Sequence, residues 1–214
     1  MNIEEALSRA FSVHAGQALT DDVIQKMTGF ILWAASQSKD QSRDPASFPH
    51  GGYQGVTFRV ERLRDVIEEL KPLHLAQFIE TDTYRHGQGL DPDYEGMIAS
   101  ERNGGYILFT ARKDGVLVGN CGIYLFTSTH TRKLNASEDT LFILHEHRAG
   151  RLGIKLFQYC EAILYGIGVH EVRFKVKNGN RVWKAWQRLG YEITGIEMSK
   201  QLQETHHASN PIQS

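Results

Sequence analysis

The segment from Leu141 to Lys177 constrains the fold of this chain more than any other part of the sequence. It begins with an apolar run typical of a buried strand, Leu141–Leu144, and continues through a loop that contains Gly150 and Gly153. The following stretch carries apolar residues at helical spacing, and residues 171–177 alternate as a strand does. A strand, a helix and a second strand in this order predict a β-α-β crossover within one sheet.

The signals from residue 56 onward fit the same sheet. Two apolar runs flank Lys113-Asp114-Gly115, and an Asp-Gly turn between such runs predicts an antiparallel hairpin. The first predicted elements are a strand at 56–60, a helix from Leu63 to about Tyr84 that Pro72 ends or kinks, and a helix from a cap at Asp91-Pro92 to about Arg102. Strands at 106–112 and 116–126 follow, then a polar loop at 127–139 and a strand at 140–144. The last predicted elements are a helix at 150–168, a strand at 171–177, a helix at 181–189 and a strand at 191–200. This order predicts an α/β (α+β) domain with a mixed, mostly antiparallel central sheet flanked by helices.

The first 55 residues follow a different pattern. The stretch Glu4–His14 has helical character, and Thr20 is placed to cap a second helix with apolar residues at helical spacing. Residues 40–55 combine Asp, Ser, Pro and Gly without an apolar period, which indicates a break. The expected division is an N-terminal helical extension at 1–40, a linker at 41–55, a main domain at 56–202 and a flexible tail at 203–214. The extension would pack on the main domain or pair two protomers as a homodimer.

Composition excludes several classes of protein. Of the 214 residues, 41% are hydrophobic and 23% are charged, which is an ordinary globular balance. No apolar run approaches the roughly 20 residues needed to span a bilayer, and the acidic N-terminal segment is unlike a secretory signal. A membrane-surface helix near the N-terminus is disfavoured because Lys26 and Lys39 are its only basic residues. Two cysteines, Cys121 and Cys160, cannot form a disulfide framework, so we expect a reducing, cytoplasmic location. From the missing apolar span and the poor basic face we expect no membrane partner.

Charge is unevenly distributed along the chain. The net charge of −1 argues against broad nucleic-acid binding. From Arg148 to Arg188, however, nine basic residues face two acidic ones, giving a local net charge of +7. Three of these bases, Arg148, Arg151 and Lys155, lie at the glycine-containing loop that opens a helix. Free backbone N–H groups and the helix dipole attract anions at such a place, so the pattern predicts a site for a diphosphate.

Two segments carry a resemblance to a known family. They are Ile143-Leu-His-Glu-His-Arg148-Ala-Gly-Arg-Leu-Gly153-Ile-Lys-Leu156 and Trp186-Gln-Arg-Leu-Gly190-Tyr191. Together with the order of elements over residues 56–200, they resemble the Gcn5-related N-acetyltransferases (GNAT). The resemblance implies acetyl-CoA as co-substrate, an amine acceptor, direct transfer in a ternary complex and no metal. The cofactor-binding residues that it implies are Ile143, Leu144, His145, Arg148, Ala149, Gly150, Arg151, Leu152, Gly153, Ile154, Lys155 and Trp186.

A closer resemblance is to acetyltransferases carried by tailed bacteriophages. It rests on the local sequence around Leu90-Asp-Pro, Gly115, Glu138-Asp139 and Arg148-Ala-Gly. It implies a phage-encoded protein that would act in the host cytoplasm.

The chain departs from the family pattern at two positions. Arg151 stands where the signature has its central glycine, although Gly150, one position earlier, can supply the turn. Trp186 stands where many members carry a tyrosine that protonates the departing thiolate, and an indole cannot supply a proton at neutral pH. The resemblance therefore leaves several alternatives. The thiolate departs unassisted or is protonated through water, another group such as Tyr191 or Tyr159 supplies the proton, or the protein is not a catalyst.

Glu138 and Asp139 are the candidate catalytic bases, together with Tyr191 as a candidate acid. Neighbouring strand residues alternate in direction, so one of the two carboxylates should point to the acceptor side. His145 and His147 are a second choice for the base, and a His-x-His pair supplies too few ligands for a metal. The resemblance implies that a backbone N–H of Leu144 or its neighbours stabilises the oxyanion. Cys160 lies among apolar residues in a helix, which indicates a core position and not a nucleophile.

Two other functions remain open from the sequence. The first is a catalytically silent GNAT-like protein that binds a partner or builds a phage structure, which the residues at positions 151 and 186 favour. The second is a nucleic-acid binder, including a transferase that acts on RNA through the basic stretch. Acceptor specificity would come from the Tyr84–Leu90 and Ser128–Asn135 loops, through Tyr84, His86, His130 and Arg132.

Overall fold

The computed structural model describes residues 43–81, 89–148, 150–177 and 182–198, together with six isolated positions between Ser12 and Met27. The tail, most of the N-terminal extension and most of the Tyr84–Leu90 loop lie outside the described residues. The chain divides into two compact units, Met1–Lys175 and Val176–Ser214, and each is described by itself.

The first unit is built around a six-stranded sheet in the order β1-β2-β3-β4-β5-β6. The strands are β1 (Gly51–Tyr53), β2 (Val56–Glu61), β3 (Tyr106–Lys113), β4 (Val116–Thr127), β5 (Leu134–Ile143) and β6 (Glu171–Arg173). All neighbours run antiparallel except β5 and β6, which are parallel. The mixed, mostly antiparallel sheet predicted from the sequence is confirmed.

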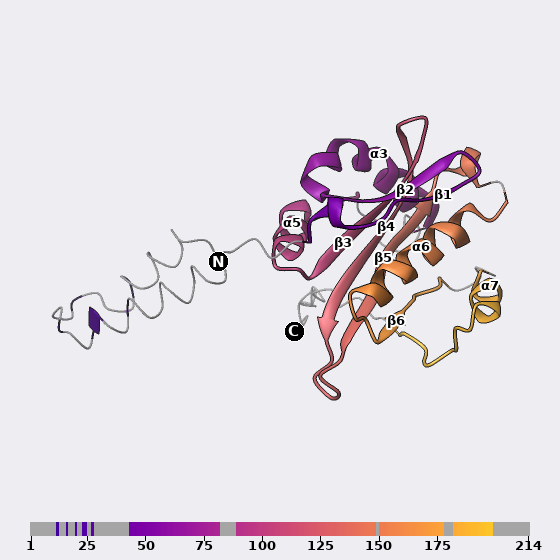
Figure 1. Ribbon diagram of the computed structural model, residues 1–214. Helices are drawn as coiled ribbons and strands as arrows, with labels where there is room; N and C mark the ends of the chain where they lie inside the picture. The colour runs from indigo at the N-terminus through magenta and orange to yellow at the C-terminus, as the bar shows by residue number, and fades with distance from the viewer. Residues whose placement is uncertain are drawn as a thin grey trace, which may run out of the picture. The chain divides into compact units, whose positions relative to one another are not determined.

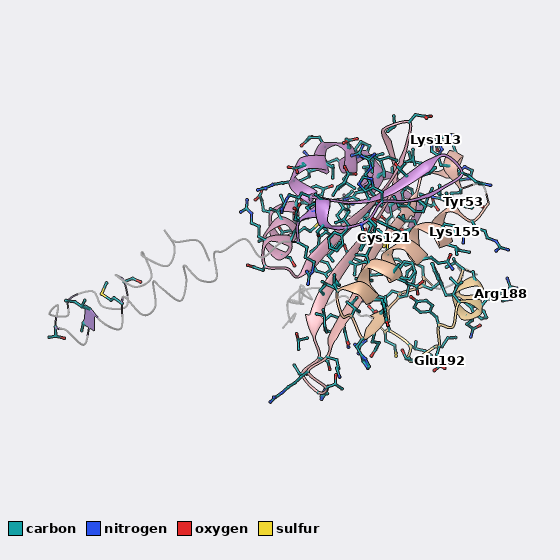
Figure 2. The ribbon with its side chains drawn as sticks, viewed as in Figure 1. Tyr53, Lys113, Cys121, Lys155, Arg188 and Glu192 are labelled. Carbon is teal, nitrogen blue, oxygen red and sulfur yellow. The ribbon has the colours of Figure 1, made fainter. Side chains whose placement is uncertain are left out.

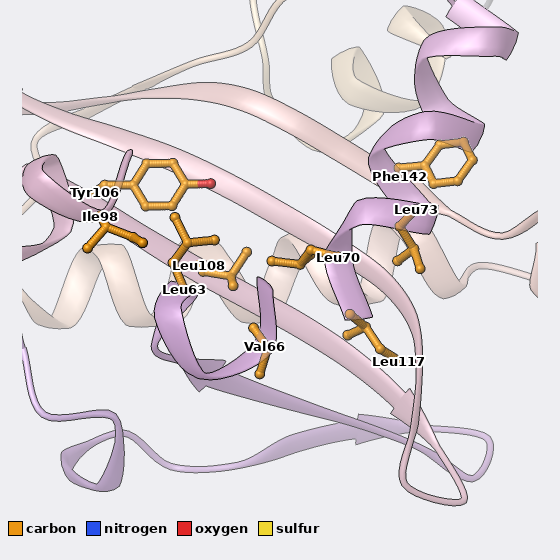
Figure 3. Close-up of a cluster of buried hydrophobic side chains, with 9 residues drawn as sticks. All are labelled: Leu63, Val66, Leu70, Leu73, Ile98, Tyr106, Leu108, Leu117 and Phe142. Atoms are coloured by element: carbon orange, nitrogen blue, oxygen red, sulfur yellow. The ribbon is translucent and has the colours of Figure 1, made fainter. Parts of the chain in front are cut away.

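Helices cover both faces of this sheet (Figure 1). Helices α3 (Leu63–Thr81) and α5 (Tyr94–Arg102) lie on one face, and α6 (Leu152–Gly166) lies on the other. Figure 3 shows the core under α3, where apolar side chains of the helix meet those of β3, β4 and β5. Its buried members are Leu63, Val66, Leu70, Leu73, Ile98, Tyr106, Leu108, Leu117 and Phe142. Burial of these side chains fixes α3 against the sheet.

The opposite face carries a second apolar layer beneath α6. Leu156, Phe157 and Cys160 of the helix are fully buried, which confirms Cys160 as a core residue. The ring of Tyr159 packs at 5.8 Å from that of Phe58 and at 6.0 Å from that of Phe109. Helix α6 is therefore fixed to the sheet by apolar contacts along its length.

Strand β1 lies inside the segment expected to be a linker. Its first residue, Gly51, packs directly against α6, because a Cβ at this position would lie 2.6 Å from Cδ2 of Tyr159. The Tyr159 hydroxyl also donates a hydrogen bond to the Pro49 carbonyl at 2.8 Å. The glycines that suggested a loop instead allow a strand to approach the helix closely.

Further details differ from the sequence prediction, and β6 ends at Arg173 although the strand was predicted to reach residue 177. Helix α3 continues through Pro72 to Thr81, so the proline does not end the helix. The cap of α5 is Asp93, whose Oδ1 accepts a hydrogen bond from Gly96 N at 2.8 Å, and not Asp91. Strand β5 begins at Leu134, within the segment predicted to be a polar loop.

The second unit, Val176–Ser214, contains α7 (Trp183–Arg188). The helix predicted at 181–189 is confirmed in its central part. The strand predicted at 191–200 is wrong for its described part, because residues 191–198 have no regular secondary structure. Alternation of apolar and polar residues does not by itself provide a strand with hydrogen-bonding partners.

Candidate functional site

The first feature of the candidate site is a strand edge that is left open. Strands β5 and β6 pair only over Asn135–Ser137 and Glu171–Arg173. Strand β5 then continues to Ile143, and among the described residues none pairs with this stretch on the side opposite β4. Its backbone groups can therefore hydrogen-bond an extended ligand that lies along the edge.

The second feature is the loop that leads from this edge into α6. After a short 3-10 helix, His145–His147, Gly150 adopts a left-handed conformation with φ of 71°. Helix α6 then begins without a side-chain cap, since the N-cap residue Arg151 makes no capping hydrogen bond. The turn expected of Gly150 is present one position before Arg151, where the family signature has its central glycine. The uncapped N–H groups at the helix start are able to donate hydrogen bonds to an anion.

Space remains around this helix start. A Cβ added to Gly153 would have Ile143 Cγ1 as its nearest neighbour, at 4.0 Å, and one added to Gly150 would lie 3.4 Å from the Tyr53 hydroxyl. Tyr53 of β1 and Lys155 in the first turn of α6 lie at this end of the sheet (Figure 2). Lys155 Nζ donates to Gln158 Oε1 at 3.0 Å, and Arg151 is exposed. Arg151 is the N-cap residue of α6 and Lys155 lies in its first turn, so both positive charges are near the helix start.

Arg148 has a different environment from these two cations. Its Nε donates to the Ile143 carbonyl at 2.8 Å, and its two terminal nitrogens bind both oxygens of Glu80 on α3, at 2.7 and 2.6 Å. The guanidinium carbon also lies 5.0 Å from the centroid of the Phe142 ring. The side chain expected to face a diphosphate is directed toward α3 instead.

The backbone at the end of β5 shows which groups face the open edge. The N–H of Leu144 donates to the Val118 carbonyl of β4 at 2.9 Å, so it is already used within the sheet. Backbone groups of successive strand residues point to opposite edges, which directs the N–H and C=O of Ile143 to the open edge. The bond from Arg148 to the Ile143 carbonyl agrees with this direction.

Asp139 occupies a β-bulge in the same strand. The register pairs Gly122 with Thr140 and Ile123 with Glu138, which leaves Asp139 as the extra residue of β5. Asp139 keeps exposed surface. Partial burial of its carboxyl nevertheless raises the pKa of Asp139, and the positive charge of Lys175 partly opposes this shift. Bulges commonly redirect a side chain next to a functional site.

Two tyrosines that the sequence analysis missed lie near this bulge. The rings of Tyr106 and Tyr124 meet edge to face with centroids 4.9 Å apart. Burial, and after it the charge of Asp139, raises the pKa of both phenols. A Cβ at Gly122 would overlap the Tyr106 hydroxyl, so this glycine makes room for it. The negative charge of Asp139 is therefore felt by two tyrosines, of which Tyr106 belongs to the core under α3 and Tyr124 packs against that core.

Polar groups surround the bulge on that face. The Thr140 hydroxyl oxygen accepts from Gly122 N at 3.1 Å and from Asn120 Nδ2 at 3.0 Å. The Tyr106 hydroxyl and the Asn120 carbonyl oxygen are buried, and neither has a hydrogen-bond partner among the described residues. Most buried polar groups in proteins have a hydrogen-bond partner, so these two atoms are exceptions.

The other predicted site residues fall in several places. Ile154 lies in the first turn of α6 behind the buried Leu152, and His145 is exposed on the short 3-10 helix. Ala149 lies outside the described residues. Within the described part of the chain, no group of three or more His, Cys, Asp or Glu residues is arranged to hold a metal ion. No described helix is long and apolar enough to cross a membrane.

Trp186 and Tyr191 belong to the second unit. Trp186 is 4% exposed, and its ring meets that of Tyr191 edge to face at 5.9 Å. Tyr159, the other tyrosine considered as an acid, packs between α6 and the sheet, where burial raises its pKa to about 12. Its hydroxyl bonds to the Pro49 carbonyl, so Tyr159 is poorly suited to protonate a thiolate.

Residues 66–191, more than half of the chain, match the Acetyltransferase (GNAT) family. The chain belongs to this family. Acetyl transfer is therefore its general chemistry, and the GNAT resemblance seen in the sequence is confirmed. No curated protein sequence matches the chain.

Solved structures are similar in fold. An aminoglycoside acetyltransferase from an uncultured soil metagenomic sample, in complex with sisomicin, has a TM-score of 0.57 at 14% identity, covering 70% of this chain and 97% of its own. The ribosomal-protein-alanine N-acetyltransferase of Brucella melitensis biovar Abortus 2308 has a TM-score of 0.54 at 17% identity, covering 69% and 99%. A possible acetyltransferase from Clostridium difficile 630 has a TM-score of 0.55 at 16% identity, covering 70% and 98%. At these identities the likeness concerns the GNAT-like fold.

Proposed function

We propose that this GNAT protein is an acetyl-CoA-dependent N-acetyltransferase that moves the acetyl group directly to an amine. The observation that carries the proposal is the open edge of β5, which ends at the uncapped start of α6. The end of the strand and the helix start are close together, since a Cβ at Gly153 would lie 4.0 Å from Ile143 Cγ1. The edge can offer hydrogen bonds to an extended chain, and the helix N–H groups can offer them to a diphosphate. These are the two chemical parts of the CoA arm.

The cofactor would contact a limited set of groups. The N–H of Ile143 faces the open edge, and the N–H groups at Arg151–Gly153 point out of the helix start. Arg151 and Lys155 add positive charge beside them. Ile154 and the remaining loop residues shape the binding surface, and Trp186 in the second unit stays a predicted contact.

Asp139 is the proposed general base. The amine nitrogen must lose a proton before or during its attack on the thioester carbon, because an alkylammonium has no free electron pair. The Asp139 carboxylate accepts that proton while the N–C bond forms. The carbonyl oxygen gains negative charge, which the Ile143 N–H would stabilise. The C–S bond then breaks, and the CoA thiolate takes a proton from water. Tyr191, in the second unit, stays a predicted acid.

The proposed acceptor is an amine on a small molecule or on a protein. Structures of similar fold include an aminoglycoside acetyltransferase and a ribosomal-protein-alanine N-acetyltransferase, which act on these two kinds of acceptor. The Tyr84–Leu90 and Ser128–Asn135 loops stay predicted determinants of this choice. The phage origin, the cytoplasmic location, the division at 40 and 55, and a homodimer through residues 1–40 likewise stay predictions.

Cofactor binding is tested by calorimetry with CoA on the full chain. Gly153→Glu places a carboxylate at the start of α6, where the added Cβ has space, so it should abolish CoA binding without unfolding the protein. Gly166→Glu is the matched control, because Gly166 lies in the same helix and a Cβ there meets nothing within 4 Å. Equal CoA affinity in both variants would refute the proposed diphosphate site.

The base is tested by comparing Asp139→Asn with Glu138→Gln. We expect Asp139→Asn to lower kcat/KM by about 10²- to 10⁴-fold, which is the usual contribution of a general base. Because burial raises the pKa of Asp139, the acidic limb of the wild-type pH profile should lie above the ordinary aspartate range and disappear in the variant. Glu138→Gln should keep most of the activity. Loss of activity only in Glu138→Gln would reassign the base.

A catalytically silent protein is the second candidate. The observation that favours it is Trp186, a buried indole where an acid would be useful. Intact-mass measurement of amine, protein and RNA acceptors detects acetyl transfer. A protein that binds acetyl-CoA but acetylates none of these acceptors would support this candidate. A transferase acting on RNA is less favoured, since Arg148 and Arg173 of the basic stretch are bonded to Glu80 and Glu171.

A further inference from the structure

The strongest unassigned feature is the contact between the cofactor loop and the end of α3. We propose that Glu80 and Arg148 form a positioning pair, which sets the conformation of the loop that binds the CoA diphosphate and connects this loop to the acceptor side of the molecule. This inference rests on the proposed function. It assigns a role to Glu80, which the sequence analysis did not single out, and changes the role of Arg148.

The geometry of the pair is well defined. Three N–H groups of Arg148 are used: one for the Ile143 carbonyl and two, in a parallel fork, for the carboxylate of Glu80. The guanidinium also lies over the Phe142 ring. One side chain therefore joins the end of β5, the cofactor loop and α3. A two-point fork fixes orientation as well as distance.

Burial and charge indicate that the pair persists at neutral pH. The side chains of Arg148 and Glu80 are 34% and 45% exposed, so the pair is partly shielded from water. The hydrogen bond from Arg148 is the main cause that lowers the pKa of Glu80, and His145 contributes in the same direction. A diphosphate would have to break this fork to engage Arg148 fully. Arg151, which is exposed, is the freer cation at the helix start.

The position of Glu80 gives the pair a second consequence. Glu80 is the penultimate residue of α3, which ends at Thr81, and the chain then enters the predicted acceptor loop. Arg148 lies five residues after Ile143, on the path from the open edge to α6. The pair therefore connects the element that precedes the acceptor loop to the loop proposed for CoA. Changing either residue should alter the cofactor site even if neither touches the cofactor.

A double-mutant cycle distinguishes this role from direct binding of the diphosphate by Arg148. The variants are Glu80→Gln, Arg148→Gln and the double variant, measured by calorimetry with CoA on the full chain. If the pair acts as a unit, each single variant weakens CoA binding about tenfold and the double variant is no weaker than either one. Glu68→Gln is the control, because Glu68 forms an exposed ion pair with Lys71 on the same helix.

Other outcomes overturn the proposal. If Arg148 binds the diphosphate directly, Glu80→Gln leaves CoA affinity unchanged or tightens it, while Arg148→Gln alone weakens it. Thermal unfolding of each variant shows whether a loss of affinity arises from a loss of fold, and Arg148→Lys replaces Arg148→Gln if that variant does not fold. Failure of the wild-type protein to bind CoA would instead refute the proposed function. If the wild-type protein binds CoA normally but the effects of the two single variants add in the double variant, only the positioning pair is refuted.

Discussion

Two arginines attach helix α3 to the sheet with similar chemistry but in different surroundings. Arg112 of β3 donates from Nε to Glu61 at 2.7 Å and from its terminal nitrogens to both oxygens of Glu69 on α3, at 2.8 and 2.9 Å. Arg148 donates from Nε to a backbone carbonyl and from its terminal nitrogens to both oxygens of Glu80. Each side chain thus forms a fork with a glutamate of the same helix.

Burial separates the two. The Arg112 side chain is 10% exposed, and it also donates to the Gly115 carbonyl in the β3–β4 turn. The Arg148 side chain is 34% exposed and lies in the loop proposed to bind CoA. A charge that is buried with its partners costs much free energy when one partner is removed, whereas a half-exposed pair is largely screened by water. We infer that Arg112 mainly stabilises the fold and that Arg148 mainly orders the site.

The largest expected effect is on stability. Arg112→Ala should lower the free energy of unfolding by about 3 kcal/mol, because Glu61 loses its cationic partner while it is only 20% exposed. Arg148→Ala should cost about 1 kcal/mol or less, since water can replace the lost partner of Glu80. Urea denaturation of both variants measures the difference. Equal losses of stability would end the distinction between the two arginines.

A smaller effect is expected when the charge is kept and the fork is removed. Arg112→Lys retains a cation but cannot contact Glu61, Glu69 and the Gly115 carbonyl together, so we expect a loss of about 1–2 kcal/mol of stability. Arg148→Lys should change stability by less than about 0.5 kcal/mol. Its measurable effect should be on CoA affinity. A lysine at 148 that preserves both stability and CoA affinity would show that the fork is unnecessary there.

The central part of the fold could be predicted because it depends on local signals. The Asp-Gly turn fixed the β3–β4 hairpin, where Asp114 and Gly115 have positive φ angles of 50° and 82°. Strand β5 was predicted to be too short because its first half contains several polar residues, including Asn135, which is nevertheless 2% exposed. Burial of a polar strand residue depends on neighbours from other segments. The final strand was predicted wrongly for the converse reason, since residues 191–198 carry an apolar pattern but have no regular secondary structure.

The site was predictable only in part, for a related reason. Gly150 and the helix start carry a loop signal that can be read along the chain. Tyr106 and Tyr124 pair only because a bulge between Ala111 and Arg112 shifts the β3–β4 register by one residue. The hairpin turn alone predicts a different pairing and therefore a different face. Glu80 and Arg148 are separated by 68 residues, and nothing in either segment indicates the other.

The smallest expected effect is the pH dependence of the two forks, and it separates stability from binding. The hydrogen bonds from Arg112 and Arg148 are the main causes that lower the pKa of Glu69 and of Glu80 below the ordinary value of 4.5. A carboxyl with a lowered pKa in the folded state stabilises the fold above its unfolded pKa, and this stabilisation is lost as the pH falls through the folded pKa. Since both glutamates are about half exposed, each contribution should stay below about 1 kcal/mol.

The measurement compares wild type with Glu69→Gln and with Glu80→Gln between pH 7 and pH 3. The stability difference from wild type should be constant above pH 4.5 and shrink below it for both variants. CoA affinity should behave differently. The advantage of wild type over Glu80→Gln should decrease in the same acidic window, because protonation of Glu80 also breaks the fork with Arg148. Glu69→Gln should bind CoA as wild type does throughout, and a parallel loss of affinity in that variant would mean that α3 responds to both arginines as one rigid element.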